Sequence, residues 1–370
     1  MARIRSFRYS PQSIESYTSD IRKDSACYIE NVDTIFSNLQ VSNELSIPVT
    51  INNQEYKNSY VNSPYTALIP YCKQELKKVD SQLLRLIIST LIFSFDNILK
   101  SAKINKVVQL NNWMLSTNLF PDVLNKAHIL KARDLMLDSN PKHVLMFRSL
   151  NYHNHAELIE WFQACGFCML PMRQVYLFDK DIRDFSKTHN YKMDKKLIGN
   201  TSYKLVQEND ITKKDYPRII ELYNMLYINK YSQHNPKFTT QFIELIAKHP
   251  NFMLEGFRNN SGTLDAVGGR FEMDGIVTLP IVGYDTSKHK KFALYRLVMM
   301  STLLYAETHH LVFNASSGAS HFKRLRGAVP FIEYAAVHYK NLPFYRKMLW
   351  KFLNITLTRI FIPIMKKYEL

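Results

Sequence analysis

A run of basic residues comes directly before a long apolar stretch in the last third of the chain. It contains Ser287, Lys288, His289, Lys290 and Lys291. The apolar stretch is expected to be a helix, and a helix N-terminus exposes unpaired N–H groups and the positive end of the dipole, which together bind phosphate. Cations are ordinarily unfavourable at that end. The run therefore indicates either a site for an anionic ligand or a loop whose lysines meet only water.

A second polar cluster follows the next expected strand and consists of a turn and a short helix with two cations: Asn314, Ser316, Ser317, Lys323 and Arg326. Gly318 allows a ligand to approach the backbone closely, and a serine is a good helix cap. Lys323 and Arg326 are three residues apart, so they share one face of the helix. This cluster is a second candidate site for a phosphorylated cofactor. The alternative is a capped surface helix with ordinary charges.

The charge of the chain is strongly uneven. The 48 Lys+Arg and 32 Asp+Glu give a net charge of +16 over 370 residues, and +11 of this falls in residues 286–370 (14 Lys+Arg against 3 Asp+Glu). A local excess of this kind favours an anionic partner. Nucleic acid, an acidic carrier protein, a phosphorylated cofactor and an anionic membrane all remain open.

Glycine is scarce, and its distribution excludes several classes of enzyme. None of the ten glycines precedes Gly166, and eight fall between Gly256 and Gly327. The sequence has no P-loop, no G-x-G-x-x-G dinucleotide motif and no G-x-S-x-G nucleophile elbow. The glycine-poor first half is therefore expected to be a scaffold, and the second half to carry the chemistry.

The cysteines indicate structure rather than metal or redox chemistry. Cys165 and Cys168 form a C-x-x-C with no second ligand pair nearby, so we expect Cys165 to end a helix, Cys168 to open a strand, and no metal to be bound. Four cysteines without a disulfide framework fit a cytoplasmic protein. The longest apolar run, Leu86–Phe95, is too short to span a bilayer and is expected to be a buried helix.

Strand and helix patterns alternate along the chain, which predicts an α/β (α+β) fold. In the first half, strands are expected at Tyr65–Tyr71, Lys106–Leu110, His143–Leu150 and Met172–Phe178, and helices at Asp80–Lys100, Asp122–Leu137 and His155–Cys165. In the second half, strands are expected at Tyr203–Gln207, Phe252–Arg258, Asp265–Glu272, Ile276–Tyr284, Leu311–Asn314 and Ile332–Tyr339, and helices at Thr212–Lys230, Phe238–Lys248, Lys290–His309, Ser320–Arg326 and from Pro343.

The two halves end on the same strand–helix–strand pattern, which indicates an internal duplication. We expect four parts: an irregular segment at 1–59, a first domain at 60–199 that ends in a charged linker over 180–200, a second domain at 200–342, and a basic amphipathic helix at 343–370. The last helix is expected either to lie on an anionic membrane or to dock on the core with its lysines outward.

Several segments resemble the carboxy-terminal signature of FemAB-like acyltransferases of the GNAT superfamily: Ser316-Ser317-Gly318-Ala319, Phe322-Lys323, Arg326-Gly327-Ala328, Glu333-Tyr334 and Leu342-Pro343, preceded by Leu294-Tyr295-Arg296-Leu297. The resemblance covers about residues 200–345, and over 60–180 it is one of architecture only. It implies tandem GNAT-like mixed sheets flanked by helices. Because the glycines and lysines gather in the second half, we expect the first copy to be degenerate and to shape the acceptor cleft. One departure is that Thr286–Phe292 has no glycine, whereas the phosphate loop of this superfamily contains glycine.

The resemblance also implies a chemistry, the transfer of an acyl or aminoacyl group to an amine. In the GNAT arrangement a splayed strand donates backbone N–H groups to the donor carbonyl, and here that strand would be Ile276–Asp285. Asp285 would act as the base through water, with Glu272 as the alternative, and Tyr334 would protonate the departing thiolate. The corresponding structural interpretations are a turn residue for Asp285, a solvent-facing charge for Glu272 and a core residue for Tyr334.

The function expected from these observations is an N-acyltransferase for groups other than aminoacyl groups, with acyl-CoA or an acyl-carrier thioester as co-substrate and no tightly bound cofactor. Two other functions remain open. One is an aminoacyl-tRNA-dependent transferase acting on a cell-envelope precursor, and the other is a non-enzymatic nucleic-acid-binding protein. The protein is expected in the cytoplasm, with the carboxy-terminal helix as its means of reaching the inner face of a membrane.

Overall fold

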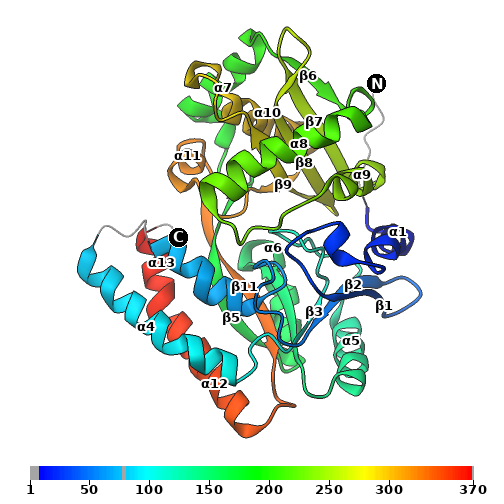
Figure 1. Ribbon diagram of the computed structural model, residues 1–370, viewed down its shortest axis with the longest axis vertical. Helices are drawn as coiled ribbons and strands as arrows, with labels where there is room; N and C mark the ends of the chain where they lie inside the picture. The colour runs from blue at the N-terminus through cyan, green and yellow to red at the C-terminus, as the bar shows by residue number, and fades with distance from the viewer. Residues whose placement is uncertain (1–7, 77–80, 369–370) are drawn as a thin grey trace. The chain divides into compact units, whose positions relative to one another are not determined.

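The computed structural model describes residues 8–76 and 81–368, which form two compact units (Figure 1). Unit 1 contains residues 8–9, Val175–Gln233 and Lys237–Pro330, and unit 2 contains Ser10–Gln174, His234–Pro236 and the described part of Phe331–Leu370. The units therefore differ from the division at residues 199 and 342 that the sequence suggested. They differ because two long strands, β5 (Cys168–Phe178) and β11 (Val329–His338), each contribute to both units.

The sheet of unit 2 is mixed. Its strands lie in the order β1-β2-β3-β4-β11-β5, where β3 and β4 are parallel and the pairs β1/β2, β2/β3 and β4/β11 are antiparallel. The four strands introduced here are β1 (Ile35–Gln40), β2 (Ser46–Asn52), β3 (Val107–Leu110) and β4 (Val144–Leu150). Every residue of β3 and β4 is buried, as expected for a parallel pair with both faces covered.

The longer helices of unit 2 are α1 (Pro11–Ile21), α4 (Gln82–Ser101), α5 (Lys126–Ser139), α6 (Tyr152–Ala164), α12 (Phe344–Thr356) and α13 (Ile362–Tyr368), the last two joined by a π-helical turn, η9 (Leu357–Phe361). A short 3₁₀ turn lies at Ser25–Cys27. Helix α1 and the β1–β2 hairpin occupy the region 1–59 that was expected to be irregular. That region does have local signals, because Ser10 caps α1 and Pro11 stands at its first position.

The prediction of a strand at Tyr65–Tyr71 is wrong. The segment is helical, as α2 (Pro64–Thr66), a π-helical stretch at Ala67–Tyr71 and α3 (Cys72–Glu75). Ser63 explains the difference, because its Oγ accepts a hydrogen bond from Thr66 N at 3.0 Å and so starts the helix. Asp80, where the helix Asp80–Lys100 was expected to start, lies outside the described residues. Helix α5 starts later than Asp122, because Asn125 accepts from His128 N at 3.0 Å and caps it there.

The sheet of unit 1 has the order β5-β10-β9-β8-β7-β6. Its strands are β6 (Lys204–Gln207), β7 (Phe252–Arg258), β8 (Leu264–Met273), β9 (Ile276–Tyr284) and β10 (Val312–Asn314). Strands β6 to β9 are antiparallel, and β10 runs parallel to β9. The strands expected at Phe252–Arg258, Asp265–Glu272 and Ile276–Tyr284 are confirmed and form a three-stranded meander, and both residues of the Asp274-Gly275 turn between β8 and β9 have positive φ.

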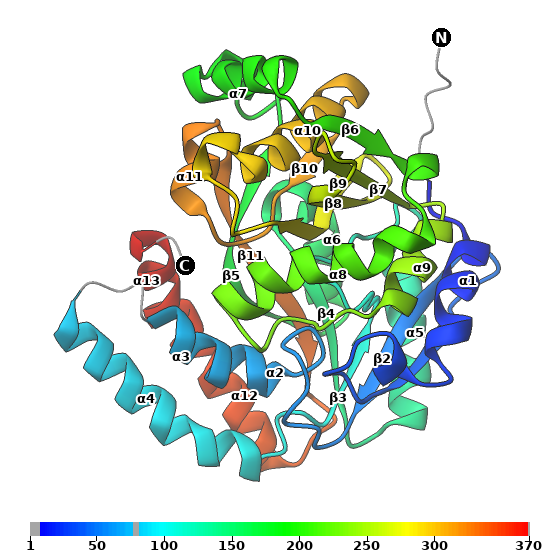
Figure 2. The same ribbon diagram turned by 45° about the horizontal axis from the view of Figure 1, so that its top comes forward.

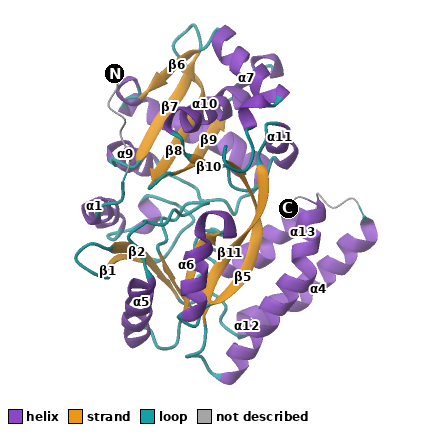
Figure 3. Cartoon of the chain, turned by 180° about the vertical axis from the view of Figure 1, so that it is seen from behind, coloured by secondary structure: helices purple, strands orange, loops and turns teal. Residues whose placement is uncertain are grey.

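Helices cover both faces of the unit 1 sheet: α7 (His189–Asn200), α8 (Tyr216–Tyr223), the π-helical η7 (Asn224–Tyr231), α9 (Thr240–Lys248), α10 (Leu294–His309) and α11 (Ser320–Leu325), with 3₁₀ turns at Phe185–Lys187, Glu208–Asp210, Lys213–Asp215 and Lys290–Phe292. Helices α8 and α9 cover one face (Figures 1 and 2), and α10 covers the other (Figure 3). The linker expected at 180–200 is instead α7, whose Tyr191 and Asp194 are buried.

The two halves repeat one pattern, as the sequence predicted. The first runs β3-α5-β4-α6-β5 and the second β9-α10-β10-α11-β11, and in each the first two strands are parallel. The halves exchange their last strands, because β5 pairs with β10 in unit 1 and β11 pairs with β4 in unit 2. The expected fold class, tandem mixed sheets flanked by helices, is confirmed.

Gly283 allows α8 to lie directly on β9. A Cβ atom at this position would stand 2.5 Å from the backbone of Leu222 and Tyr223, which no side chain can relieve. We expect Gly283→Ala to lower the free energy of unfolding by about 1–3 kcal/mol through overpacking. The matched control is Gly199→Ala, where nothing lies within 4 Å. Equilibrium unfolding in urea should show the loss for Gly283→Ala alone, and equal stability of the two variants would contradict this account of the helix contact.

Candidate active site

Strand β9 extends well beyond its parallel neighbour β10. The nine residues of β9 pair with the three of β10 only from Ile276 to Thr278. After Asn314 the chain leaves β9, and Ala315 and Ser316 bond to the backbone of Tyr176 instead. The part of β9 after Thr278 therefore has, among the described residues, no strand opposite it on the β10 side.

A bulge marks the point where β10 leaves. On β8, Phe271 pairs with Thr278 and Gly269 pairs with Ile281, so two residues of β9, Leu279 and Pro280, stand opposite one of β8. Proline lacks an N–H and is found in sheets at bulges and edges. Beyond the bulge Asp285 N donates to Asp265 O of β8 at 2.8 Å. Because successive N–H groups of a strand alternate in direction, those of Val282 and Tyr284 point to the open side.

The loop after β9 is held by Asp285, which is 7% exposed. Its carboxylate accepts from Ser287 N at 3.0 Å, from Ser287 Oγ at 2.6 Å and from Arg218 Nη2 at 2.7 Å. Burial raises the pKa of Asp285, but the hydrogen bonds from Ser287 and Arg218 outweigh it and leave the pKa below its usual value. A carboxylate held in this way is a weak base, so the geometry fits the turn role that the sequence offered as the alternative.

Two residues of this site were missed by the sequence analysis, Asp265 and Arg218. Asp265 is 1% exposed and accepts from Tyr203 Oη and Asn259 Nδ2, both at 3.0 Å. Arg218 Nη2 and Lys288 Nζ approach its carboxylate at 3.7 and 3.5 Å. Lys288 is thus partly neutralised within the protein. The available signal was an aspartate inside an apolar strand, since a buried charge needs partners.

The remaining cations of the basic run face outward. Lys290 and Lys291 are exposed, and within the described residues no carboxylate pairs with either of them. His289 is exposed as well, and its Nδ1 accepts from Lys291 N at 3.1 Å. Helix α10 begins directly after this run, at Leu294, with Ala293 in the left-handed region at φ 51°. Two unpaired cations therefore stand next to the positive end of a sixteen-residue helix.

Lys323 does not face a ligand. It is 3% exposed, and its Nζ donates to the carbonyl oxygens of Ala315 at 2.6 Å, Ser317 at 2.9 Å and Ser316 at 3.2 Å. The ammonium group also lies 5.5 Å from the centroid of the Tyr176 ring. Lys323 therefore holds the turn that carries the chain away from β9.

The same turn is conformationally demanding. Ser316, Gly318 and Ala319 all have positive φ, which is costly for residues other than glycine. The side chain of Asn314, 2% exposed, stabilises it by accepting from Ser316 N at 2.9 Å. The predicted polar turn thus exists, and the polar atoms named here bond to the protein itself.

Arg326 also turns inward. Its Nε donates to Asp194 Oδ2 at 2.6 Å and its Nη1 to Phe322 O at 2.9 Å. Asp194 of α7 is 1% exposed and takes a second arginine, Arg296, on its other oxygen at 2.7 Å. One carboxylate thus joins three helices: α7, α10 and α11.

Glu272 belongs to a buried network between the sheet and α10. It is 5% exposed, not solvent-facing, and its Oε2 accepts from Tyr305 Oη at 2.7 Å. The guanidinium of Arg270 lies over the Tyr305 ring at 4.1 Å and pairs with Glu255 at 3.1 Å. Burial, and then the bond to Glu272, raise the pKa of Tyr305. These contacts place Glu272 in the interior under α10.

Tyr334 lies in unit 2, whereas Asp285 and Glu272 lie in unit 1. Its ring packs edge-on against Tyr152 at 5.5 Å, and burial raises its pKa. The neighbouring Glu333 forms a two-pronged pair with Arg173, at 2.7 and 3.2 Å. The Glu333-Tyr334 pair of the signature therefore makes packing and ionic contacts inside unit 2.

A cluster of aromatic residues lies around the end of β9, and the sequence analysis did not single it out. The ring centroids of Tyr284 and of Tyr295, at the start of α10, are 6.1 Å apart, and those of Tyr295 and Phe322 are 4.9 Å apart. Lys230 Nζ is 3.4 Å from Tyr284 Oη. A signal was present: Tyr223, Tyr227 and Tyr231 recur every four residues, which places them on one helical face.

Across residues 8–76 and 81–368, no group of three or more His, Cys, Asp or Glu is arranged to hold a metal ion. Cys165 caps α6 and Cys168 opens β5, and both are free thiols, as expected.

Searches of protein families and of curated proteins give no match to this chain. Solved structures do show similarity to this chain. L-PGS from Bacillus licheniformis is 12% identical, with 66% of this chain and 80% of that chain covered and a TM-score of 0.47. FemX is 8% identical, with 62% and 80% of the two chains covered and a TM-score of 0.45, and a tandem GNAT protein from the clavulanic acid biosynthesis pathway is 12% identical, with 62% and 75% covered and a TM-score of 0.35. FemX and a tandem GNAT protein are the classes to which the sequence resemblance pointed.

Proposed function

We propose that unit 1 is an N-acyltransferase domain that takes an acyl group from a thioester and passes it to an amine. The observation that carries this proposal is the open side of β9 beyond Thr278, followed at once by Lys290 and Lys291 at the start of α10. A strand edge offers backbone hydrogen bonds to an extended arm. Free cations at a helix N-terminus suit the phosphates of CoA or of an acyl-carrier protein.

The chemistry assigned to the open strand is stabilisation of the oxyanion. The neutral amine attacks the thioester carbonyl carbon, a C–N bond forms, and the carbonyl oxygen becomes negative. The N–H groups of Val282 and Tyr284 point to the side where that oxygen would lie, and such donors stabilise developing charge. The C–S bond then breaks, the thiolate leaves, and the proton lost by the amine neutralises it, directly or through water.

The earlier candidate residues take different roles in this proposal. Lys290 and Lys291 bind the donor phosphates. Asp285 is a positioning residue, since it holds Ser287 and Arg218. Lys323 and Arg326 shape the turn and the helices around the site, and Glu272 supports α10 from beneath.

The test is to measure the KM for the acyl donor in the double variant Lys290→Ala/Lys291→Ala. We expect the KM for acyl-CoA or acyl-carrier protein to rise about 10- to 100-fold, because a hydrogen bond to a charged group contributes about 1.5–3 kcal/mol and solvent exposure reduces that value. The kcat should change little. The matched control is Lys366→Ala/Lys367→Ala, an exposed pair on α13 of unit 2 that should leave KM unchanged.

Thermal shift of the wild-type protein identifies the donor. Stabilisation by CoA or acyl-carrier protein, lost in the Lys290/Lys291 variant and kept in the control, supports the proposal. Stabilisation by tRNA alone would contradict a thioester donor and favour the aminoacyl-tRNA-dependent alternative. Equal loss in both variants would show that overall charge, and not this site, is responsible.

A further inference from the structure

Helices α4 and α12 of unit 2 each have two apolar faces. One face is packed in a common core cluster that includes Ile88, Ile92, Trp350 and Leu353. Phe95 packs against this cluster, and its ring stacks on the half-exposed ring of Phe352 with the centroids 5.7 Å apart. Figures 1 and 3 show the two helices side by side. The other face is open to solvent. An ordinary surface helix has a polar outer face, so the second apolar face is unusual.

The exposed apolar side chains follow helical spacing on both helices. We define the α4/α12 surface by six of them: Leu83, Leu86, Phe93, Phe344, Met348 and Phe352. Leu83, Phe93 and Phe344 are 69%, 70% and 77% exposed. Monomeric soluble proteins rarely expose many large apolar side chains on adjacent helices, and exposed apolar patches mark interaction sites.

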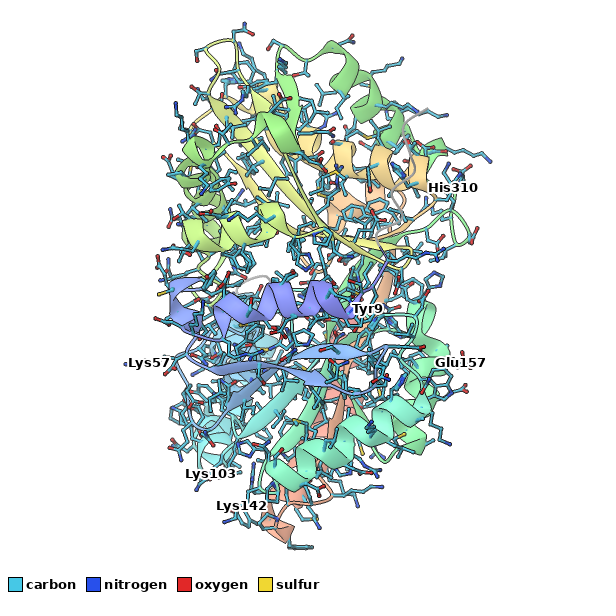
Figure 4. All side chains as sticks on the ribbon, turned by 90° about the vertical axis from the view of Figure 1, so that its right-hand side faces the viewer. Tyr9, Lys57, Lys103, Lys142, Glu157 and His310 are labelled. Carbon is cyan, nitrogen blue, oxygen red and sulfur yellow. The ribbon has the colours of Figure 1, made fainter. Side chains whose placement is uncertain are left out.

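Basic residues predominate among the described charges next to this surface. Residues 344–368 contain six basic residues and no acidic one. Of these, Arg346 is buried, and it donates to the carbonyl oxygens of Ala102, Lys103 and Lys142, the last two labelled in Figure 4. Lys351, Arg359, Lys366 and Lys367 are exposed, and no described carboxylate pairs with them. The single acid of α4, Asp96, is already paired with Lys100 at 3.0 Å.

The combination of exposed apolar side chains and unpaired cations favours an anionic bilayer as the partner. Apolar side chains flanked by unpaired cations are typical of helices that lie in the headgroup region of an anionic bilayer. A second copy of the chain would bring like charges together, which is unfavourable. A protein partner would have to be both apolar and acidic over the same area.

Spanning the bilayer is less favourable than lying on it. The helix Phe344–Tyr368 is long and apolar enough to span, with 25 residues and a hydropathy of 1.3. However, one third of its apolar 18-residue window is buried inside the protein. Spanning would remove Trp350 and Leu353 from the core cluster and place Lys351 and Arg359 in hydrocarbon, where charges are costly.

We propose that the α4/α12 surface docks unit 2 on an anionic lipid bilayer, with the apolar residues entering the headgroup boundary and the exposed lysines and arginine contacting lipid phosphates. The surface uses two helices that are far apart in sequence, so the carboxy-terminal helix alone is only half of it. This inference does not depend on the proposed transferase activity.

The test is co-sedimentation of the full chain with vesicles of phosphatidylcholine alone or mixed with phosphatidylglycerol. We expect binding to the anionic vesicles that weakens as salt is raised, and little binding to phosphatidylcholine. Phe93→Ser/Phe344→Ser should weaken binding at least tenfold without loss of stability, because both rings are exposed. The matched control Ile35→Ser/Leu325→Ser removes exposed apolar residues elsewhere and should bind as the wild type does.

Three results would overturn the proposal. The first is equal binding by the surface variant and the control. The second is a dimer in solution that only the surface variant disrupts, which would assign the surface to a second copy. The third is resistance of the bound protein to alkaline carbonate extraction, which would indicate a spanning helix. A Lys351→Ala/Arg359→Ala variant that retained full binding and its salt dependence would likewise contradict the assigned lipid contacts.

Discussion

Replacing Glu255 with alanine is expected to lower the free energy of unfolding by about 3–5 kcal/mol, the usual loss when one partner of a buried ion pair is removed. Glu255 is fully buried, and Arg270 is 2% exposed. Their Oε2 and Nη1 atoms are 3.1 Å apart, and Ser301 Oγ donates to the same oxygen at 2.8 Å. Without Glu255, the charge of Arg270 would remain buried with no carboxylate in contact. Unfolding in urea measures the loss.

Two further variants separate the ion pair from simple packing. The double variant Glu255→Leu/Arg270→Met removes both charges, and it should recover most of the stability because apolar residues often replace a buried pair without loss. Glu244→Ala breaks an exposed pair with Lys213 and should change stability little. If the double variant were as unstable as Glu255→Ala, cavity formation would explain the effect and the role of the charge would be refuted.

Lys323→Met is expected to destabilise unit 1 and to remove the proposed transferase activity together. In this variant three backbone carbonyls lose their hydrogen-bond donor. An unpaired buried polar group costs about 1–3 kcal/mol, and water replaces part of the lost bonding. We therefore expect the free energy of unfolding to fall by about 2–4 kcal/mol. The turn at 315–317 would no longer be held away from β9. We therefore expect kcat/KM to fall at least about 100-fold, as a small misplacement of a reacting group can do.

The measurement that distinguishes the two roles of Lys323 is stability in the absence of donor. A lysine that binds donor phosphate would leave stability unchanged on substitution and would raise only the KM. A lysine that holds the turn lowers the melting temperature of the free protein. Arg324→Met is the matched control, because Arg324 is the exposed neighbouring cation. A variant Lys323→Met with wild-type stability and a raised KM would refute the turn-holding role.

Local signals in the sequence predicted much of unit 1. The capping box of Thr212 and Asp215 is present at the expected helix start. Alternating apolar residues and turn residues such as Asp274-Gly275 predicted the β7–β9 meander, because a strand pattern and a turn conformation depend on residues next to one another. The same is true of Cys165 and Cys168 at the ends of α6 and β5.

The directions of the charged side chains could not be predicted in this way. Lys323 and Arg326 have the spacing of a ligand-binding face, yet both are buried. Arg326 turns inward because Asp194, 132 residues earlier, lies at its guanidinium. A partner so far away in the sequence leaves no trace in local spacing, and the charged segment containing Asp194 looked like a linker for the same reason.

The sequence by itself determined the alternation of strands and helices, the duplicated pattern, the position of the basic run before α10, and the concentration of positive charge in the last 85 residues. Periodicity, caps and composition carry that information, and all are local. Only the tertiary structure decided that β5 and β11 exchange between the halves and that β10 leaves β9 after Thr278. It also decided that Lys290 and Lys291 stay exposed without a carboxylate partner among the described residues, while Lys323 and Arg326 are used internally. Those outcomes depend on which groups distant in sequence come into contact, because a buried polar or charged group without a partner is costly in free energy.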